Sequence, residues 1–282
     1  MFADLHIHSV YSDGTLSPDD VIEKAKNQKV TLISICDHNS IDAYVESESL
    51  FRNNEVTVIP GVEITSVMDN IEYHILAYGF DIKNKTLNDL LQYNRDVYIG
   101  MGNNLIENIS VDYPSVSLKE FLGYKRSLKN GGWDSIDYLR NKGLVADWEG
   151  YSDILRKYGS RPKQGFLSPT EVIKIIHNAG GYAVLAHLYH YEKSDNAGYE
   201  KKAIQFINMG IDGFECYYPF HSSELTGLLV KLCHEHDLLV TAGSDDHGGF
   251  IGVPGGEYFI GAVKIEVERL NLKGLKRASR SK

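Results

Sequence analysis

Short apolar runs recur along the chain, and most of them end in polar residues. Several are apolar nearly throughout, which is typical of strands buried on both faces of a parallel sheet. Many of them are separated by segments with helical spacing. Two of these segments begin with a Ser-Pro pair, at Ser17 and at Ser168, and the second pair is followed by Glu171 in a capping-box pattern. The runs cover residues 2–8, 31–38, 56–65, 72–79, 181–187, 210–218 and 238–247. The alternation predicts an α/β fold, and a barrel of about seven βα units fits the chain length.

Residues 85–165 break this alternation. They read as a helix followed by mixed polar and basic segments, and we expect a helical insertion that caps the barrel and contacts the substrate. The predicted organisation is therefore a (β/α) barrel over 1–84 and 166–265, an insertion over 85–165, and a basic, solvated tail over 266–282.

Charge and composition exclude several classes of protein. The net charge of −9 disfavours wrapping of nucleic acid, although bound metal ions could still attract a phosphorylated substrate. The start resembles no signal peptide, and no apolar stretch reaches the roughly 20 residues that span a bilayer. Cys36, Cys216 and Cys233 are too sparse and too far apart for a disulfide framework. We therefore expect a cytoplasmic protein without membrane contact, and the oligomeric state has no signal.

Histidines and carboxylates gather at the ends of the apolar runs. His6 and His8 alternate on the first run, so both rings project from one face of a strand. The carboxyl ends of barrel strands form one mouth, where we expect these side chains to converge. Imidazole and carboxylate together suit Zn, Mn or Fe, and so many ligands suit two or three divalent ions. The nine predicted metal ligands are His6, His8, Asp13, His38, Glu63, His74, His187, Asp245 and His247.

Six motifs together resemble the polymerase and histidinol phosphatase (PHP) family. They are DLHIHSVYSDG, CDHN, PGVEIT, HILAYG, VLAH and GSDDHG, in family order. The resemblance implies a distorted seven-stranded (β/α) barrel with a trinuclear metal centre. It further implies one ion at His6, His8, Glu63 and Asp245, a second at Asp13, His38 and His247, and a third at Glu63, His74 and His187, with Glu63 bridging. Asp4, Asp37 and Glu215 would contact these ligands without binding the ions themselves.

The closer resemblance is to stand-alone PHP phosphoesterases with a helical insertion, which include nucleoside 3′,5′-bisphosphate phosphatases and 5′-to-3′ RNA-trimming enzymes. This chain departs from that branch at GGWDS, residues 131–135, where the branch has Gly-Arg-Pro-His. Trp133 thus replaces an arginine expected to bind phosphate. Trp133 could stack on a base or pack inside the insertion. The predicted substrate contacts are Arg126, Trp133, Arg161, Lys163 and His221, with Arg156 as a further candidate.

The predicted activity is hydrolysis of a phosphomonoester or a terminal phosphodiester by a hydroxide that bridges two metal ions. The predicted catalytic residues are Asp245 and, as proton donor to the leaving group, His187 or His221. A nucleotide, an RNA end, histidinol phosphate or another phosphorylated metabolite all remain open as substrates. Two other functions stay open: an amidohydrolase-like metal hydrolase of a non-phosphate substrate, and a PHP module that binds metal without catalysis.

Overall fold

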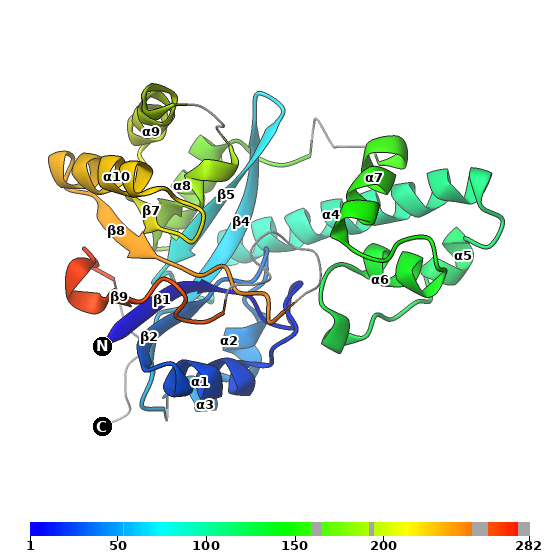
Figure 1. Cartoon of the computed structure of the whole chain (residues 1–282), viewed down its shortest axis with the longest axis horizontal. Helices are drawn as coiled ribbons and strands as arrows, with labels where there is room; N and C mark the ends of the chain where they lie inside the picture. Colours follow the sequence, from blue (N-terminus) through cyan, green and yellow to red (C-terminus); the bar gives the residue numbers. More distant parts are fainter. Residues whose placement is uncertain (53, 160–164, 192–194, 250–258, 276–282) are drawn as a thin grey trace.

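The computed structural model describes residues 1–52, 54–159, 165–191, 195–249 and 259–275, and their fold is mixed α/β (Figure 1). Each of the seven predicted apolar runs contains a strand. The strands are β1 (Phe2–Ile7), β2 (Val30–Ile35), β3 (Thr57–Val58), β4 (Gly61–Met68), β5 (Ile71–Tyr78), β6 (Tyr182–Leu185), β7 (Gly213–Tyr217), β8 (Leu239–Ala242) and β9 (Ile265–Glu266). The helices are α1 (Pro18–Asn27), α2 (Asp42–Glu46), α3 (Glu48–Arg52), α4 (Lys85–Asp112), α5 (Leu118–Phe121), α6 (Asp134–Asn141), α7 (Trp148–Tyr158), α8 (Pro169–Asn178), α9 (Asn196–Met209) and α10 (Ser223–Glu235). Three short 3-10 turns are η1 (Leu128–Asn130), η2 (Leu188–His190) and η3 (Val267–Arg269).

The described strands form two sheets. One has the order β3-β2-β1-β9 and the other the order β4-β5-β6-β7-β8. Single β-bridges join the two sheets, between Ile7 and Asp246 and between His38 and Glu63. The predicted seven-stranded barrel is therefore not confirmed, because the continuous hydrogen-bonded ladders divide into sheets of four and five strands.

A β-hairpin interrupts the predicted parallel order. β4 and β5 pair antiparallel, and β5 also runs antiparallel to β6. The hairpin turns at Asp69 and Asn70, whose φ values of 53° and 63° are those of a two-residue type I′ turn. As a result Glu63 and His74 lie within long strands that project from the sheet, not at the carboxyl ends of parallel strands.

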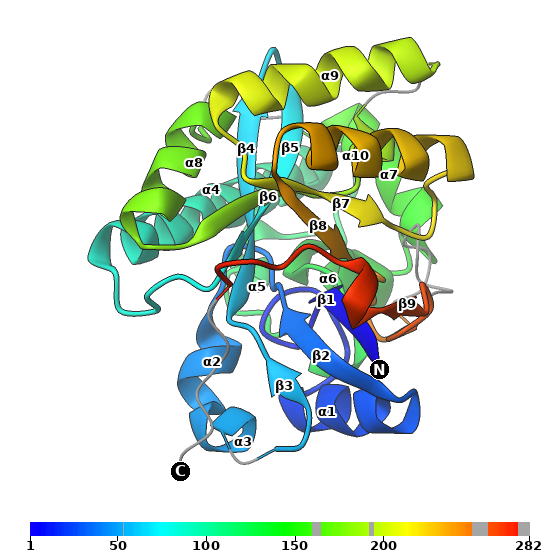
Figure 2. The same cartoon turned by 90° about the vertical axis from the view of Figure 1, so that its left-hand side faces the viewer.

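Helices cover both sheets (Figure 2). α1, α2 and α3 lie beside β2 and β3, while α8, α9 and α10 lie over the five-stranded sheet. The predicted N-terminal signals of two helices are confirmed: Ser17 forms a capping box with Asp20 at α1, and Ser168 forms one with Glu171 at α8. Each box satisfies backbone N–H groups that a helix start leaves without partners.

Helices α4 to α7 project to one side of the sheets (Figure 1). The first half of α4 places Leu87, Leu90 and Leu91 in the main core, whereas its second half places Ile106 and Ile109 in a separate core with side chains of α6 and α7. α4 therefore connects the two cores as one continuous helix of 28 residues.

The segment after residue 264 is in part folded. β9 pairs with β1, and Asn271 exchanges backbone hydrogen bonds with Val240. Leu270, Leu272 and Leu275 pack on the core beneath β1. Residues 266–275 are thus packed on the fold, whereas the solvated tail was expected over 266–282, of which residues 276–282 lie outside the described residues. No helix in the part of the chain that the structure describes combines the length and apolar character that a bilayer crossing requires.

Candidate metal centre

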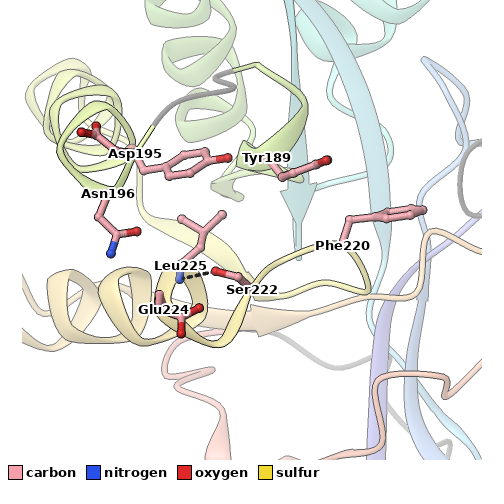
Figure 3. Close-up of a pocket in the computed structure, with 8 residues that line it drawn as sticks. Tyr189, Asp195, Asn196, Phe220, Ser222, Glu224 and Leu225 are labelled. Atoms are coloured by element: carbon pink, nitrogen blue, oxygen red, sulfur yellow. Dashed lines mark hydrogen bonds between the residues drawn. The ribbon is translucent and has the colours of Figure 1, made fainter.

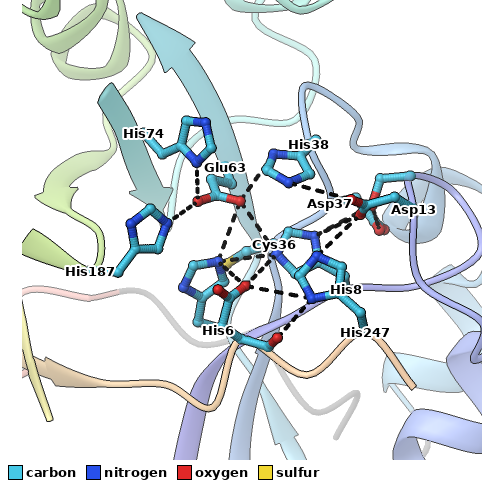
Figure 4. A network of polar contacts seen from close by, with 12 residues as sticks. His6, His8, Asp13, Cys36, Asp37, His38, Glu63, His74, His187 and His247 are labelled. Carbon is cyan, nitrogen blue, oxygen red and sulfur yellow. Dashed lines mark hydrogen bonds and ion pairs between the residues drawn. The ribbon is translucent and has the colours of Figure 1, made fainter. Parts of the chain in front are cut away.

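The nine predicted ligands lie together where β1, β4, β5 and the segments after β2, β6 and β8 meet (Figure 4). Glu63 is at the centre of this cluster and is fully buried. Its two carboxylate oxygens face five imidazoles. Oε1 is 2.9 Å from Nδ1 of His74 and 3.0 Å from Nε2 of His187, while Oε2 is 3.1 Å from Nδ1 of His38, 3.3 Å from Nε2 of His8 and 3.4 Å from Nε2 of His6.

Among the described residues, three overlapping groups of side chains have ligand atoms close enough together to hold a metal ion. They are His6, His8, Glu63 and Asp245; His8, Asp13, His38 and His247; and His38, Glu63 and His74. The first group has the same members as the set implied for the first ion. The second adds His8 to the implied set, and the third contains His38 in the place expected for His187. His187 nevertheless lies beside the third group through its contact with Glu63.

The contacts within the cluster fit metal ligands better than a self-sufficient hydrogen-bond network. The Nε2 atoms of His6 and His8 lie only 3.1 Å apart, so at least one ring must carry a proton to avoid facing lone pairs. Oε2 of Glu63 and Nδ1 of His38 lie 3.1 Å apart but are not aligned for a hydrogen bond. Among the described residues, these two atoms and Nδ1 of His187 are buried without a hydrogen-bond partner. Such groups are costly to bury unless a cation satisfies them. Nitrogen and oxygen donors in this mixture suit Zn, Mn or Fe.

Backbone geometry places several of these ligands. His187 and Asp245 have left-handed backbones, with φ of 28° and 56°, which cost energy in residues other than glycine. Gly243 lets β1 and β7 approach each other, because a Cβ there would stand 2.2 Å from Cβ of His6 and 2.4 Å from Oε1 of Glu215. The backbone is therefore strained just after β6 and β8, where the predicted ligands converge.

Carboxylate and carbonyl groups fix the orientation of two ligand rings. Glu215 lies behind His6, with Oε1 3.0 Å from Nδ1, and its Oε2 accepts the backbone N–H of His187. His247 donates Nδ1–H to the carbonyl of Asp245 at 2.8 Å. In the neutral form of both rings Nε2 therefore carries the lone pair that faces the cluster, the usual arrangement behind a metal-ligating histidine.

The other two predicted supporters act on the backbone and on serines. Asp4 accepts the N–H groups of Ser244 and Gly261, at 2.9 and 2.8 Å, so it joins β1 to the segment after β8 and does not orient a histidine ring. Asp37 accepts the hydroxyls of Ser9 and Ser12, at 2.6 and 2.5 Å. Asp37 thereby fixes the turn that carries Asp13.

Burial and charge perturb the pKa values across the cluster. Burial disfavours charge on His8 and His74, yet the surrounding carboxylates outweigh it and raise the pKa of each ring to about 10. For His38 burial prevails and lowers the pKa to about 4. Burial alone would raise the pKa of Glu63, but the neighbouring imidazoles hold it well below its usual range. The carboxylates are thus ionised and available to cations.

The predicted substrate contacts that the structure describes lie at different places in the fold. Trp133 lies at the start of α6, with its ring 5.7 Å from that of His38 and stacked on Tyr98 at 5.3 Å. Arg126 donates Nη2 to the carbonyls of Val10 and Ser12, on the turn that leads to Asp13. Arg156 is exposed on α7 and pairs with Asp153. Arg161 and Lys163 lie outside the described residues.

His221 lies beside the cluster with both ring nitrogens engaged. Nδ1 donates to the carbonyl of Cys216 at 3.2 Å, and Nε2 accepts the backbone N–H of Tyr189 at 3.5 Å. These contacts do not favour His221 as a proton donor. A cavity of about 430 Å³ opens next to it, lined by Tyr189, Tyr199, Phe220 and the first residues of α9 and α10 (Figure 3).

A family model described as PHP domain matches residues 4–230, which is more than half of the chain. The chain belongs to the PHP family. Among its relatives, the 5′-3′ exoribonuclease Rnm of Salmonella typhimurium is 28% identical over 266 residues, which covers 86% of this chain and 84% of the relative. The 3′,5′-nucleoside bisphosphate phosphatase of Chromobacterium violaceum is 26% identical over 253 residues, or 86% of each chain. The crystal structure of a Bifidobacterium adolescentis protein, assigned as a metal-dependent phosphoesterase, superposes with a TM-score of 0.69 at 26% identity and covers 94% of both chains.

Some residues at this PHP centre were not predicted from the sequence. Tyr218 donates its hydroxyl to Oδ2 of Asp245 at 3.2 Å and lies 2.8 Å from Nε2 of His190. Its position directly after β7 is the signal that could have revealed it, since polar groups at strand ends face the mouth. Glu72 of β5 contacts His74, and its position two residues before that histidine is the signal that could have revealed it. Tyr98 of α4 contacts Glu72, and no spacing in the sequence points to this tyrosine.

Proposed function

We propose that this PHP chain is a metal-dependent phosphoesterase that holds two or three divalent ions at the nine clustered residues. The observation that carries the proposal is the buried Glu63 carboxylate, which faces five imidazoles and belongs to two of the three ligand groups. The PHP family assignment and the phosphoesterase names of its relatives support the same reaction class. Mn, Zn and Fe are the proposed ions, because the donors are imidazole and carboxylate.

Divalent ions at such a site lower the pKa of water towards neutrality and neutralise charge on phosphate oxygens. The chain's own residues prepare the site for this chemistry. Glu215 and the carbonyl of Asp245 direct the Nε2 lone pairs of His6 and His247 inwards. Tyr218 holds Asp245 in place through its hydroxyl. Where two ions are held by the other eight residues and His187 stays unligated, we assign proton transfer to the leaving group to His187 in preference to His221, since Nδ1 of His187 has no hydrogen-bond partner among the described residues.

The proposed substrate is a phosphomonoester or a terminal phosphodiester of nucleotide type, such as a nucleoside bisphosphate or an RNA end. The names of the relatives support this class. Trp133, 5.7 Å from His38, offers a flat surface for a base where the related branch has an arginine.

We propose a domain organisation in which the strands carry the metal cluster and residues 85–165 form a separate insertion. The strands around the cluster act as one distorted barrel, which is supported by the β-bridges that join the two sheets at Ile7 and at His38. Residues 85–165 act as an insertion with its own core, and Gly132 reaches the cluster by donating its N–H to the carbonyl of Asp13 at 2.7 Å.

The test is a turnover screen of the metal-loaded protein against phosphomonoesters, phosphodiesters and amides, with elemental analysis of the same samples. We expect phosphate release from nucleotide-type esters, loss of turnover after chelation and recovery with Mn or Zn. His8→Ala and Asp245→Asn are expected to abolish turnover while leaving the circular dichroism spectrum unchanged. Turnover of amides alone would indicate an amidohydrolase-like enzyme, and stoichiometric metal with no turnover would indicate a non-catalytic PHP module.

A further inference from the structure

His74 is held at both of its ring nitrogens. Nδ1 faces the metal cluster, 2.9 Å from Oε1 of Glu63, and Nε2 lies 3.0 Å from Oε1 of Glu72. Glu72 and His74 are two residues apart on β5, so their side chains project from the same face of the strand. Glu72 belongs to none of the three ligand groups found among the described residues. It therefore stands behind His74 with respect to the cluster.

Glu72 is held in turn by a residue of helix α4. The hydroxyl of Tyr98 donates to the same Oε1 of Glu72 at 2.6 Å. It also lies 3.1 Å from Oγ1 of Thr65, the residue paired with His74 across the β4–β5 hairpin. The chain Tyr98–Glu72–His74–Glu63 is thus continuous from the insertion helix to the centre of the cluster.

The same stretch of α4 contacts the other side of this ligand group. Asn94 donates Nδ2 to Oδ1 of Asn39 at 2.8 Å, and Arg95 donates Nη1 to the carbonyl of Asn39 at 2.5 Å. Asn39 directly follows His38 and has a left-handed backbone, with φ of 51°. The ring of Tyr98 stacks on Trp133 with an interplanar angle of 8°. One helical segment therefore reaches the neighbourhoods of both histidines in the His38–Glu63–His74 group.

A carboxylate that accepts the outer N–H of a ligand histidine fixes the tautomer and the ring orientation, and it makes the inner nitrogen a stronger donor. Donation of Nε2–H to Glu72 leaves the lone pair on Nδ1, which is the atom that faces Glu63. The Tyr98 hydroxyl then restrains the one carboxylate oxygen that His74 uses. Loss of such an outer partner lowers metal affinity by about 10- to 100-fold in other metal sites.

We propose that Glu72 and Tyr98 are positioning residues for His74, through which helix α4 sets the cation affinity of the His38–Glu63–His74 group. The inference rests on the proposed function insofar as that group binds a divalent cation. It goes further by assigning control of one of the three groups to the insertion, through residues outside all three groups. The other two groups, which contain neither His74 nor Glu72, are not controlled in this way.

The test uses four variants of the full chain. Tyr98→Phe removes the hydroxyl but keeps the ring on Trp133, and Glu72→Ala removes the acceptor. Glu72→Gln keeps an acceptor oxygen without the charge. Tyr93→Phe is the matched control, since Tyr93 lies on the same helix and is 49% exposed. Metal-free protein is titrated with Mn²⁺ by equilibrium dialysis with elemental analysis, and the binding steps are assigned by comparison with His74→Ala.

We expect Glu72→Ala to weaken the step that His74→Ala removes by about 10- to 100-fold. Glu72→Gln and Tyr98→Phe should weaken that step less, and Tyr93→Phe should leave it unchanged. As a second readout, long-range ¹H–¹⁵N spectra of the imidazoles in metal-free protein, recorded at a pH above the His74 pKa of about 10 so that this ring is neutral, should show the Nε2–H tautomer of His74 in wild type and its loss in Glu72→Ala. A purely structural role would not change the tautomer of one histidine.

Two results overturn the inference. Unchanged affinity at that step in Glu72→Ala would show that His74 needs no outer partner, and an equal loss at all three steps would show general destabilisation. Failure of the proposed function looks different, because wild-type protein itself would then take up no cation at any step.

Discussion

Glu63→Gln is the substitution that most sharply separates a shared metal centre from three independent sites. Glu63 belongs to two of the three ligand groups, whereas Asp13 belongs to one. Glu63→Gln leaves three ligands in the first group and only His38 and His74 in the third, while the group around Asp13 stays complete. If wild type fills all three groups, metal content should therefore fall from three ions per chain to one. Asp13→Asn, the matched control, should lower it only from three to two.

The expected loss of metal affinity determines the free Mn²⁺ concentration at which the assay should be run. Loss of an outer partner costs a metal site about 10- to 100-fold in affinity, so loss of a ligand carboxylate should cost at least about 100-fold, or about 2.7 kcal/mol. With free Mn²⁺ buffered about tenfold above the wild-type Kd, occupancy of an affected group drops from about 90% to about 10%. Elemental analysis after dialysis measures this directly. Three retained ions in Glu63→Gln, or equal losses in both variants, would refute the shared-carboxylate reasoning.

The remaining predictions concern protons and the insertion. In metal-free protein the pKa values of His8 and His74 are raised to about 10, so both rings are protonated at neutral pH and must each release a proton to bind a cation. Apparent metal affinity should therefore rise with pH from about 6 to about 9. Calorimetry in two buffers of different ionisation enthalpy should detect the released protons. A metal affinity independent of pH would contradict this prediction. Ile106→Ala, in the fully buried second core on α4, should lower the free energy of unfolding by about 2 to 5 kcal/mol in urea titrations while metal content at saturation stays unchanged. A parallel loss of metal would show that the insertion core does not fold separately from the metal centre.

The clustering of the nine predicted ligands could be predicted from the sequence better than the direction of the strands that carry them. His6 and His8 could be predicted because two residues on one strand share a face, and all seven apolar runs contain strands. The hairpin at Asp69 and Asn70 was missed, because a two-residue turn without glycine gives a weak signal. It reverses the direction of β5, which therefore runs antiparallel to both β4 and β6 within the five-stranded sheet.

Partners that act across long sequence separations could not be predicted at all. Tyr98 meets Glu72 across 26 residues, and this contact depends on how α4 crosses the hairpin, not on any local pattern. Arg126 is a residue whose hydrogen-bond acceptors could not be predicted from the sequence. Its predicted contact with the phosphate stays a prediction, while its Nη2 donates to the carbonyls of Val10 and Ser12. A basic residue in a sequence shows the charge that is available but not the acceptor that the fold supplies.

The central claim is that one buried carboxylate and its surrounding imidazoles hold several cations that make this PHP chain a phosphoesterase. The most direct measurement is phosphate release from a nucleoside 3′,5′-bisphosphate, recorded against the number of Mn²⁺ ions bound per chain as metal-free protein is reloaded. We predict no turnover without metal and an increase that requires more than one ion per chain. Turnover by fully metal-free protein, or binding of no cation at saturating Mn²⁺, would contradict the account.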